Sequence, residues 1–276
     1  FEERNQKMAA ANVPFRRGIS LGWMLSLRDI KNRYANSYAG IAWSVGVPLL
    51  NALITVLVFS ILMSGRMGER YNDVPFPIFF FVPFVLWMLF SEIVGRSPSV
   101  LKEHGYLITK IAFPTWVLPF VPLASTFLSQ LILLILVSGM FIYNHLMPAE
   151  HWYVFGLLWV ICLMFSMGVS YAVSAISVYI PDMVQTIPVA LNIVFWLTPL
   201  LYPPSLVENS GRSAVRAIIM DFNPFFYFVE IARIAVFVDQ PVPWMQIAGL
   251  AAFSFLTLVL GYLVFHKLKS GFADVI

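Results

Sequence analysis

Charged side chains are scarce in this chain. Of its 276 residues, 11% are Asp, Glu, Lys or Arg and 60% are hydrophobic, whereas charged residues make up about 25% of an ordinary soluble domain. The formal net charge of +3 is too small to favour nucleic-acid binding. The composition therefore argues against a soluble globular domain and predicts an integral membrane protein without a nucleic-acid partner.

The chain also lacks the residue patterns that common enzyme chemistry needs. A single cysteine, Cys162, lies in an apolar run and cannot form an intrachain disulfide. No GxxxxGK(S/T) phosphate-binding loop, HExxH motif, paired-cysteine ligand set or GxSxG motif occurs. We predict no catalytic residue, no metal site and no cofactor on this chain. The apolar runs hold few charges, which argues against ion-coupled transport and places the energy source on another polypeptide.

Six apolar runs are long enough to cross a bilayer, which takes about 20 residues in a helix. The runs are 41–64, 76–95, 117–143, 152–179, 183–202 and 244–265. Twelve Lys and Arg residues flank them on the side of both termini, and five flank the other side. Because positively charged loops stay in the cytoplasm, both termini are predicted to be cytoplasmic. The predicted fold class is an all-α integral membrane protein with six transmembrane helices.

A basic amphipathic segment, residues 19–43, leads into the first run. Six apolar or aromatic residues recur there at spacings of three and four, so they would share one face of a helix. They are Trp23, Leu27, Ile30, Tyr34, Tyr38 and Ile41. Arg28, Lys31 and Arg33 lie among the polar remainder. Such a helix lies in the membrane–water interface with its cations toward anionic headgroups.

The segment between the second and third runs, residues 97–114, mixes charged and apolar residues. Pro98 is expected to start a short cytoplasmic helix, and Pro114 marks the start of the third span. A peripheral motor protein would contact such a helix; the alternative is a simple connector that packs on the membrane. The candidate coupling residues are Leu101, Lys102, Glu103, Leu107, Ile108 and Lys110.

Aromatic residues make up 16% of the chain, and several gather in the second and fifth runs. Tryptophan at span ends is usually an interface anchor, and mid-span phenylalanine usually faces lipid or the core. The other interpretation is that one aromatic face lines a conduit, because aromatic rings stack on the C–H surfaces of sugars. The candidates are Phe80, Phe84, Trp87, Phe195 and Trp196.

The fourth run carries small residues at four-residue spacing. Ser166, Ser170 and Ser174 repeat beside Gly168. Small side chains let two membrane helices approach closely, so this stripe predicts a helix-packing seam more than a polar pore lining.

The long segment between the fifth and sixth runs, residues 203–243, is too apolar for a free loop and too charged for a seventh span. We predict two short helices, broken at Asn223-Pro224, that re-enter the outer leaflet from outside. Irregular backbone at membrane depth is tolerated only against protein or a water-filled cavity. The alternative is an ordinary external loop with an amphipathic helix.

Several stretches, in order along the chain, carry specific residue patterns. The segment before the first run has Arg28-Asp29-Ile30-Lys31-x-Arg33-Tyr34-x-x-Ser37-x-x-Gly40-x-x-Trp43. The segment between the second and third runs has Leu107-Ile108-x-Lys110-x-x-Phe113-Pro114, and the tail has Lys267-Leu268-Lys269-x-x-Phe272-Ala273-Asp274. Together with Asn223-Pro224, these patterns resemble those of ABC type-2 permeases that export polysaccharides, where they mark the entry to the first span, the cytoplasmic coupling region, the tail and the external re-entrant helices. The likeness covers essentially the whole chain and is greatest to the membrane subunits of O-antigen exporters.

The resemblance implies one transmembrane domain over residues 1–276 in the bacterial inner membrane. Its parts are the interface helix (19–40), spans one to five (41–202), the external segment (203–243), span six (244–265) and a cytoplasmic tail (266–276). Two copies would form a homodimer around a conduit, with two copies of a separate ABC ATPase that binds ATP and Mg beneath them. The substrate would be an undecaprenyl-linked glycan. Arg28, Lys31 and Arg33 would attract its pyrophosphate or anchor the helix to headgroups.

Other functions fit the same pattern. A permease for teichoic acid, capsule, a drug or a small lipid would share the architecture. A membrane-embedded glycan acyltransferase, from a different class, would need a histidine or carboxylate in a membrane-level pocket. The histidines near span ends, His104, His145 and His151, are its candidates.

Overall fold

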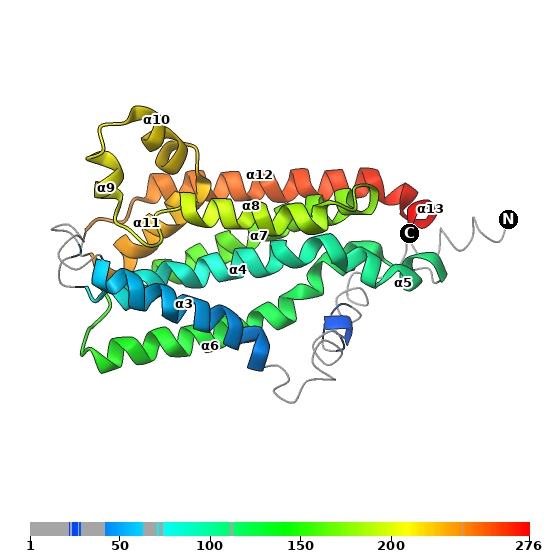
Figure 1. Ribbon diagram of the computed structural model, residues 1–276. Coiled ribbons are helices and arrows are strands. Elements are labelled where there is room, and N and C mark those ends of the chain that lie inside the picture. Colours follow the sequence, from blue (N-terminus) through cyan, green and yellow to red (C-terminus); the bar gives the residue numbers. More distant parts are fainter. Residues whose placement is uncertain are drawn as a thin grey trace.

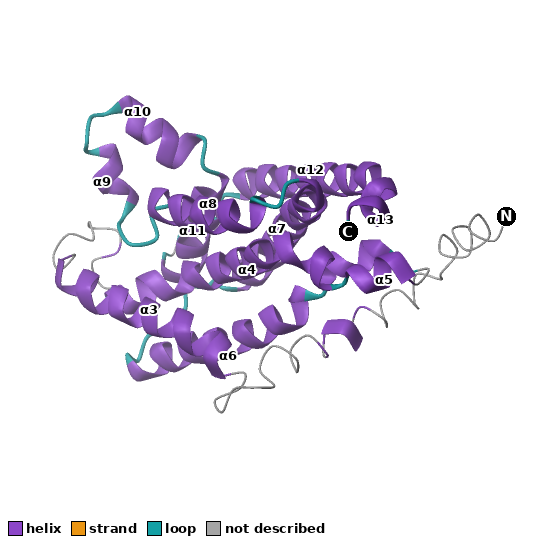
Figure 2. Ribbon diagram, turned by 45° about the vertical axis from the view of Figure 1, so that its right-hand side comes forward, coloured by secondary structure: helices purple, strands orange, loops and turns teal. Residues whose placement is uncertain are grey.

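The structure is a computed structural model that describes residues 22, 24–26, 28, 42–62, 71, 74–110, 113–238 and 240–276. Throughout these residues the regular elements are helices, and none of them is a strand. The long helices are α3 (Ala42–Leu62), α4 (Phe76–Glu103), α6 (Pro122–Tyr143), α7 (Tyr153–Tyr179), α8 (Met183–Leu197) and α12 (Trp244–Leu268). They lie side by side and run alternately in opposite directions (Figures 1 and 2).

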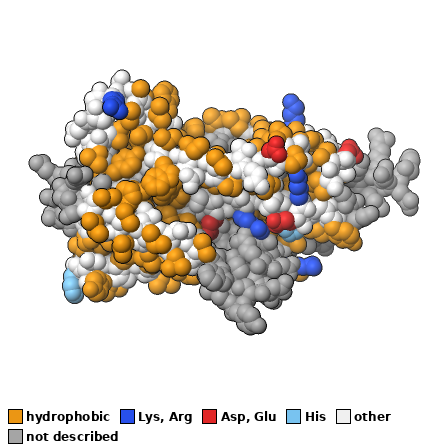
Figure 3. Space-filling view, viewed as in Figure 1, with side chains coloured by type: hydrophobic (Ala, Val, Ile, Leu, Met, Phe, Trp, Pro, Cys, Tyr) orange, Lys and Arg blue, Asp and Glu red, His pale blue; other side chains and the backbone are white. Residues whose placement is uncertain are grey.

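Shorter elements cluster at the two ends of this bundle (Figure 1). We call one end the α5 end; it carries α5 (Gly105–Lys110), η2 (Thr115–Phe120), η4 (Lys269–Gly271) and α13 (Phe272–Val275). We call the other the α9 end; it carries α9 (Pro204–Glu208), α10 (Ser213–Arg216), the π-helical turn η3 (Ala217–Asp221) and α11 (Pro224–Phe237). On the visible face, charged side chains gather mostly toward the α5 end and hydrophobic ones cover much of the rest (Figure 3).

Four helical segments are long and apolar enough to cross a membrane. They are Phe76–Glu103, Thr115–Tyr143, Tyr153–Tyr179 and Trp244–Val275. Within the described residues, Leu49–Leu62 of α3 and Met183–Leu197 are shorter apolar helices. The predicted all-helical fold is thus confirmed for the described residues. Four of the six predicted spans meet the length criterion, and the first and fifth runs form apolar helices beside them.

The fifth run ends five residues earlier than predicted. Its helix α8 stops at Leu197, and Thr198 adopts the extended conformation (φ −89°, ψ 132°). Pro199 follows directly, and a proline ring disfavours the helical conformation of the residue before it. With 15 residues, α8 is about 22 Å long, short of the roughly 30 Å hydrocarbon core.

The second run extends further than predicted, because Pro98 does not start a separate helix. α4 continues for 28 residues through both Pro83 and Pro98 and ends at Glu103. Prolines are tolerated in membrane helices where neighbouring groups satisfy the freed backbone. Beside Pro98, the Ser97 hydroxyl lies 2.7 Å from both the Ile93 carbonyl and Ser170 Oγ, so α4 is tied to α7 at this point.

The centre of the bundle is α4. In its most apolar stretch of 18 residues, 83% of the residues are buried, against 22% in the corresponding stretch of the segment Trp244–Val275, which contains α12. Phe79, Phe80 and Phe81 are fully buried, and α3, α6, α7, α8 and α11 all contact this helix. In lipid, helix association depends on van der Waals packing more than on the hydrophobic effect, because lipid tails are as apolar as the side chains. The phenylalanine side chains of α4 supply that packing.

The predicted small-residue seam on α7 is confirmed as a helix-packing surface. Gly168 faces α12, where an added Cβ would lie 2.6 Å from backbone atoms of Thr257 and Leu258. Gly261 of α12 in turn faces the Gly168 backbone. α7 and α12 therefore approach backbone to backbone. Ser166, Ser170 and Ser174 are fully buried as well, and Ser170 contacts Ser97 of α4, so the serine stripe packs toward a different helix.

This seam predicts opposite effects for two glycines of α7. Gly168→Ala should lower the stability of the protein by about 1–3 kcal/mol, because backbone atoms cannot move aside for the new methyl group. Gly156→Ala, where nothing lies within 4 Å of the added Cβ, should be neutral or gain up to about 1 kcal/mol from helix propensity. Thermal unfolding of the two variants in the same detergent checks this. Equal midpoints would show that the seam does not limit stability.

Candidate transport site

The predicted coupling residues lie at the α5 end, on the last turn of α4 and on α5. Lys102 and Glu103 are exposed, Leu107 and Ile108 are half-buried, and Lys110 is the last residue of α5. Leu101 is fully buried, so its side chain packs inside the protein and does not reach a docking surface. Tyr106, which was not among the candidates, is 69% exposed. Among the described side chains of α5 and the last turn of α4, the exposed ones are Lys102, Glu103 and Tyr106.

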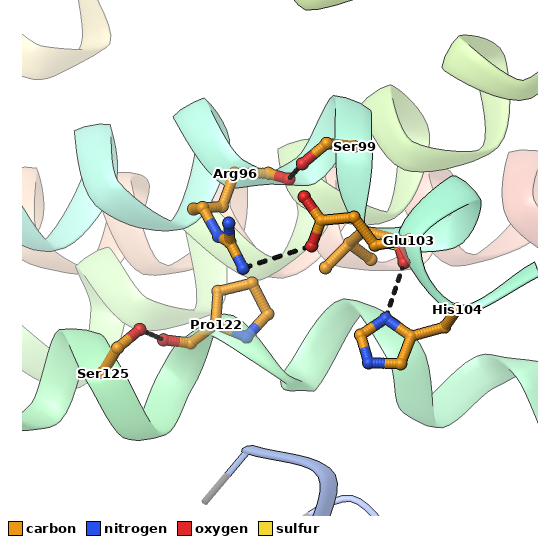
Figure 4. Close-up of polar contacts among 7 residues, drawn as sticks. Arg96, Ser99, Glu103, His104, Pro122 and Ser125 are labelled. Atoms are coloured by element: carbon orange, nitrogen blue, oxygen red, sulfur yellow. Dashed lines mark hydrogen bonds and ion pairs between the residues drawn. The ribbon is translucent and has the colours of Figure 1, made fainter. Parts of the chain in front are cut away.

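Polar contacts hold the end of α4 together at this surface. Arg96 Nη2 lies 3.4 Å from Glu103 Oε2, and both face the start of α6 near Pro122 (Figure 4). His104 Nδ1 lies 2.9 Å from the Val100 carbonyl oxygen. The ion pair is partly exposed, 23% and 41% for the two side chains, so it contributes at most about 1 kcal/mol. It orients the last turn of α4 more than it stabilises the fold.

The C-terminal tail packs against the start of α5. Phe272 is fully buried and packs against the rings of Phe265 and Tyr179. The Tyr179 hydroxyl donates a hydrogen bond of 2.8 Å to the Leu268 carbonyl. A Cβ added at Gly105 would lie 2.5 Å from the Ile276 side chain, so the first residue of α5 rests on the tail. Sequence reasoning matched Phe272 to a family pattern without identifying this contact.

The predicted substrate-entry cluster lies mostly outside the described residues. Arg28 is exposed and helical, whereas Lys31 and Arg33 are not described. Whether the three cations gather around one phosphate stays a prediction.

The aromatic residues proposed to line a conduit divide into two groups. Phe80, Phe84 and Trp87 are buried in the bundle: the Phe80 and Phe84 rings stack with centroids 4.8 Å apart, and Trp87 meets Phe225 at 5.1 Å. In this conformation other helices cover all three, so they do not face open space. Phe195 is half-buried and Trp196 is 54% exposed. Of the five, these two on α8 are the more accessible.

Asn223-Pro224 marks the start of α11, as predicted. The Asn223 side chain caps the helix by accepting a 3.0 Å hydrogen bond from the Phe225 N–H, and Pro224 occupies the first helical turn, where its missing N–H costs nothing. Asn223 Nδ2 also donates to Thr198 Oγ1 at 2.9 Å, which ties α11 to the end of α8. The rest of the external segment differs from the prediction, because α9, α10 and η3 replace a single short helix.

Sequence reasoning missed the role of Arg233 on α11. Its side chain is fully buried, Nη2 donates to the Leu200 carbonyl at 2.8 Å, and the guanidinium carbon lies 3.6 Å from the Phe79 ring centroid. Burial lowers the pKa of Arg233 to about 10, and Glu230 opposes this shift, so the group is charged at neutral pH. A buried charge is costly unless other groups compensate it. An arginine between Ala232 and Ile234 in an apolar helix was the available signal.

Glu230 lies one turn before Arg233 and is held by a residue distant in sequence. The Tyr71 hydroxyl donates a 3.0 Å hydrogen bond to Glu230 Oε1. Tyr71 is itself buried against Phe79, with ring centroids 5.3 Å apart. α11 is therefore fixed at three points: Asn223 to α8, Arg233 to α4 and the α8–α9 turn, and Glu230 to Tyr71.

Comparison with known proteins agrees with this architecture. Residues 21–237 match the model of the ABC-2 type transporter family, and the chain belongs to this family of membrane transport proteins. It is 31% identical over 261 residues to the O-antigen export system permease protein RfbA of Myxococcus xanthus, covering 92% of this chain and 95% of that protein. The RfbA protein of Klebsiella pneumoniae is 23% identical over 273 residues, with 93% and 97% covered.

A second kind of relative is the polysialic acid transport protein KpsM of Escherichia coli. It is 21% identical over 243 residues, covering 88% of this chain and 91% of that protein. The family resemblance inferred from the sequence is thus confirmed, and it extends over nearly the whole chain.

The link between Asn223 and Thr198 gives a test of how the external segment is held. Asn223→Ala should cost about 1–2 kcal/mol, because both the cap and the interhelical bond are lost. Thr198→Val should cost less, and the double variant should be less destabilised than the sum by at least about 0.5 kcal/mol. Chemical denaturation in detergent measures the cycle, with Asn209→Ala, an exposed asparagine of the same segment, as control. Strict additivity would mean that the two side chains do not interact.

Proposed function

We propose that the chain is the transmembrane subunit of an ATP-driven exporter that moves lipid-linked polysaccharide of the O-antigen type outward. ATP would bind, with Mg, to a separate ATPase subunit. The observation that carries the proposal is the 31% identity to an O-antigen export permease along 95% of that protein's length. Capsule export is the second candidate, favoured by the more distant likeness to a polysialic acid transport protein.

The α5 end is the proposed docking surface for the ATPase. Lysine, glutamate and tyrosine side chains are exposed there, and the charge distribution of the sequence favours a cytoplasmic location for this end. Because α5 follows directly on α4 and rests on the C-terminal tail, a push on α5 would act on two helices that reach the opposite end.

The proposed path of the substrate follows three cationic side chains and the more accessible aromatic side chains of a single copy of the chain. Arg28, Lys31 and Arg33 would attract the pyrophosphate of an undecaprenyl-linked glycan at the cytoplasmic interface. Two copies of the chain would enclose the conduit between them. Phe195 and Trp196 on α8 suit such a lining better than Phe80, Phe84 and Trp87, which are covered within the chain.

The proposal is tested by co-purification with an ABC ATPase and by the surface glycan of a deletion strain. We expect a P-loop ATPase to co-purify and the deletion strain to lose its full-length surface glycan. Loss of drug resistance with an intact glycan would instead favour a drug or lipid permease. Chemical analysis of the missing polymer separates O-antigen from capsule and teichoic acid.

A charge reversal at the docking surface separates coupling from folding. Lys102→Glu should weaken ATPase association by about tenfold, a loss of roughly 1.4 kcal/mol. Reversing the charge turns an attractive contact between the lysine and the ATPase into a repulsive one. Its effect on stability should be small, since the side chain is exposed. Arg212→Glu, an exposed reversal at the α9 end, is the matched control. An equal effect of both variants on association would remove the α5 end as the docking surface.

A further inference from the structure

Two neighbouring cavities lie against α11 at the α9 end. The first has a volume of about 490 Å³ and lies between α9, α11, the start of α12 and the residues Gln240, Pro241 and Pro243, with Tyr71 at one wall. The second has a volume of about 380 Å³ and lies between η3, α11 and α12. Both are in the range of small-ligand sites. Tyr227 and Gln246 line both cavities, so the two are adjacent; we call the pair the α11 cleft and each cavity one of its lobes.

One face of α11 supplies the wall of the first lobe. Tyr227, Glu230 and Ile234 line it, and their spacing of three and four residues places them on one side of the helix. The opposite side of α11 is buried in the bundle, with Phe225, Phe228 and Ala232 almost fully covered. The cleft-facing side chains are thus carried by a helix that is fixed at its back.

The lining combines the groups that bind sugar rings. Among the described residues of the cleft, the charged ones are carboxylates: Glu208 and Glu230 in the first lobe and Asp221 in the second. Carboxylate and amide oxygens accept hydrogen bonds from hydroxyl groups, and the Gln246 amide can also donate. Tyr227, between the lobes, offers an aromatic ring of the kind that packs on the C–H face of a sugar.

Two features point to a chain-like and uncharged ligand. A cleft whose lobes share Tyr227 and Gln246 suits two successive units of a polymer better than a compact molecule. Like-charge contacts are unfavourable, so carboxylates in both lobes disfavour a polyanion. The hydrogen bond from Tyr71 holds Glu230 at 3.0 Å, and a preorganised acceptor loses little entropy on binding.

We propose that the α11 cleft is a glycan-binding site that holds two successive units of an uncharged polysaccharide near the outlet of the transporter. This inference rests on the proposed function in exporting a glycan, and it adds the place and the charge class of the bound segment. Tyr227 stacks on a sugar ring, Gln246 bonds hydroxyls in both lobes, and Glu230 accepts hydroxyl hydrogen bonds in the first.

The test measures binding to the purified full-length chain in nanodiscs by saturation-transfer NMR. One probe is a set of oligosaccharides released by mild acid from the surface glycan of the host cell, with their sugar composition determined. The other is oligosialic acid, as an acidic glycan. We expect the host oligosaccharides to be uncharged and to bind, and oligosialic acid to bind at least about tenfold more weakly.

Variants assign the binding to the cleft. Gln246→Ala and Tyr227→Ala should each weaken binding of the host oligosaccharides by about tenfold, the effect of losing one good polar or stacking contact. Gln246 is exposed, so its variant should fold normally even if the tyrosine variant does not. Gln185→Ala, which changes an exposed glutamine in the first turn of α8 that lines neither lobe, is the matched control and should bind as the unaltered chain does.

The outcomes separate the cleft from the function. Unchanged binding by both cleft variants, or equal binding of oligosialic acid, would overturn the inference while glycan export and ATPase association still support the exporter. A shift to monomer in the cleft variants, with binding intact, would assign the surface to a second copy of the chain instead. If the unaltered chain neither exports a glycan nor associates with an ATPase, the proposed function itself fails.

Discussion

The packing of α3, α6, α7, α8 and α11 depends on the phenylalanine-rich helix α4, and α12 joins the bundle through α7. Phe79, Phe80 and Phe81 are fully buried and point to different sides of α4, which contacts helices from both halves of the chain. In a bilayer the hydrophobic effect does little to bring helices together, because lipid and side chain are equally apolar. Shape and dispersion must do it, and large flat rings provide many contacts per residue. The glycines of α7 and α12 do the same by the opposite means, removing side chains so that backbones meet.

At the α9 end, polar anchors take over from apolar packing. Asn223, Arg233 and Glu230 each bind a group far away in sequence: Thr198, Leu200 and Tyr71 respectively. Irregular backbone near a membrane must have its polar groups satisfied by protein. The carbonyl at Leu200, exposed by the end of α8, is satisfied by the buried guanidinium of Arg233. These bonds fix α11, and α11 in turn sets the positions of Tyr227 and Glu230 in the cleft.

Local signals made part of this structure predictable. Long apolar runs identified the apolar helices, four of which are long enough to span a bilayer. The Asn223-Pro224 pair identified the start of α11, and the spacing of Ser166, Ser170 and Ser174 identified a buried packing surface of α7. The errors came from prolines, which act according to context: Pro98 continues α4, whereas Pro199 ends α8. Contacts between distant residues, such as Arg233 with Phe79, have no periodicity to reveal them. The same holds for the α11 cleft, because its walls come from four separate segments.

The unbroken length of α4 has a mechanical meaning. Its 28 residues make a rod of about 42 Å, with the proposed docking surface at one tip and Phe79, the ring under Arg233, near the other. A stiff rod held near its Glu103 end, about three-quarters of the way along from Phe76, by the serine contact to α7 behaves as a lever. A small tilt imposed near Glu103 would therefore displace Phe79, against which α11 packs. The contacts of α11 with an outgoing polymer would then change whenever the ATPase acts on the other side of the membrane.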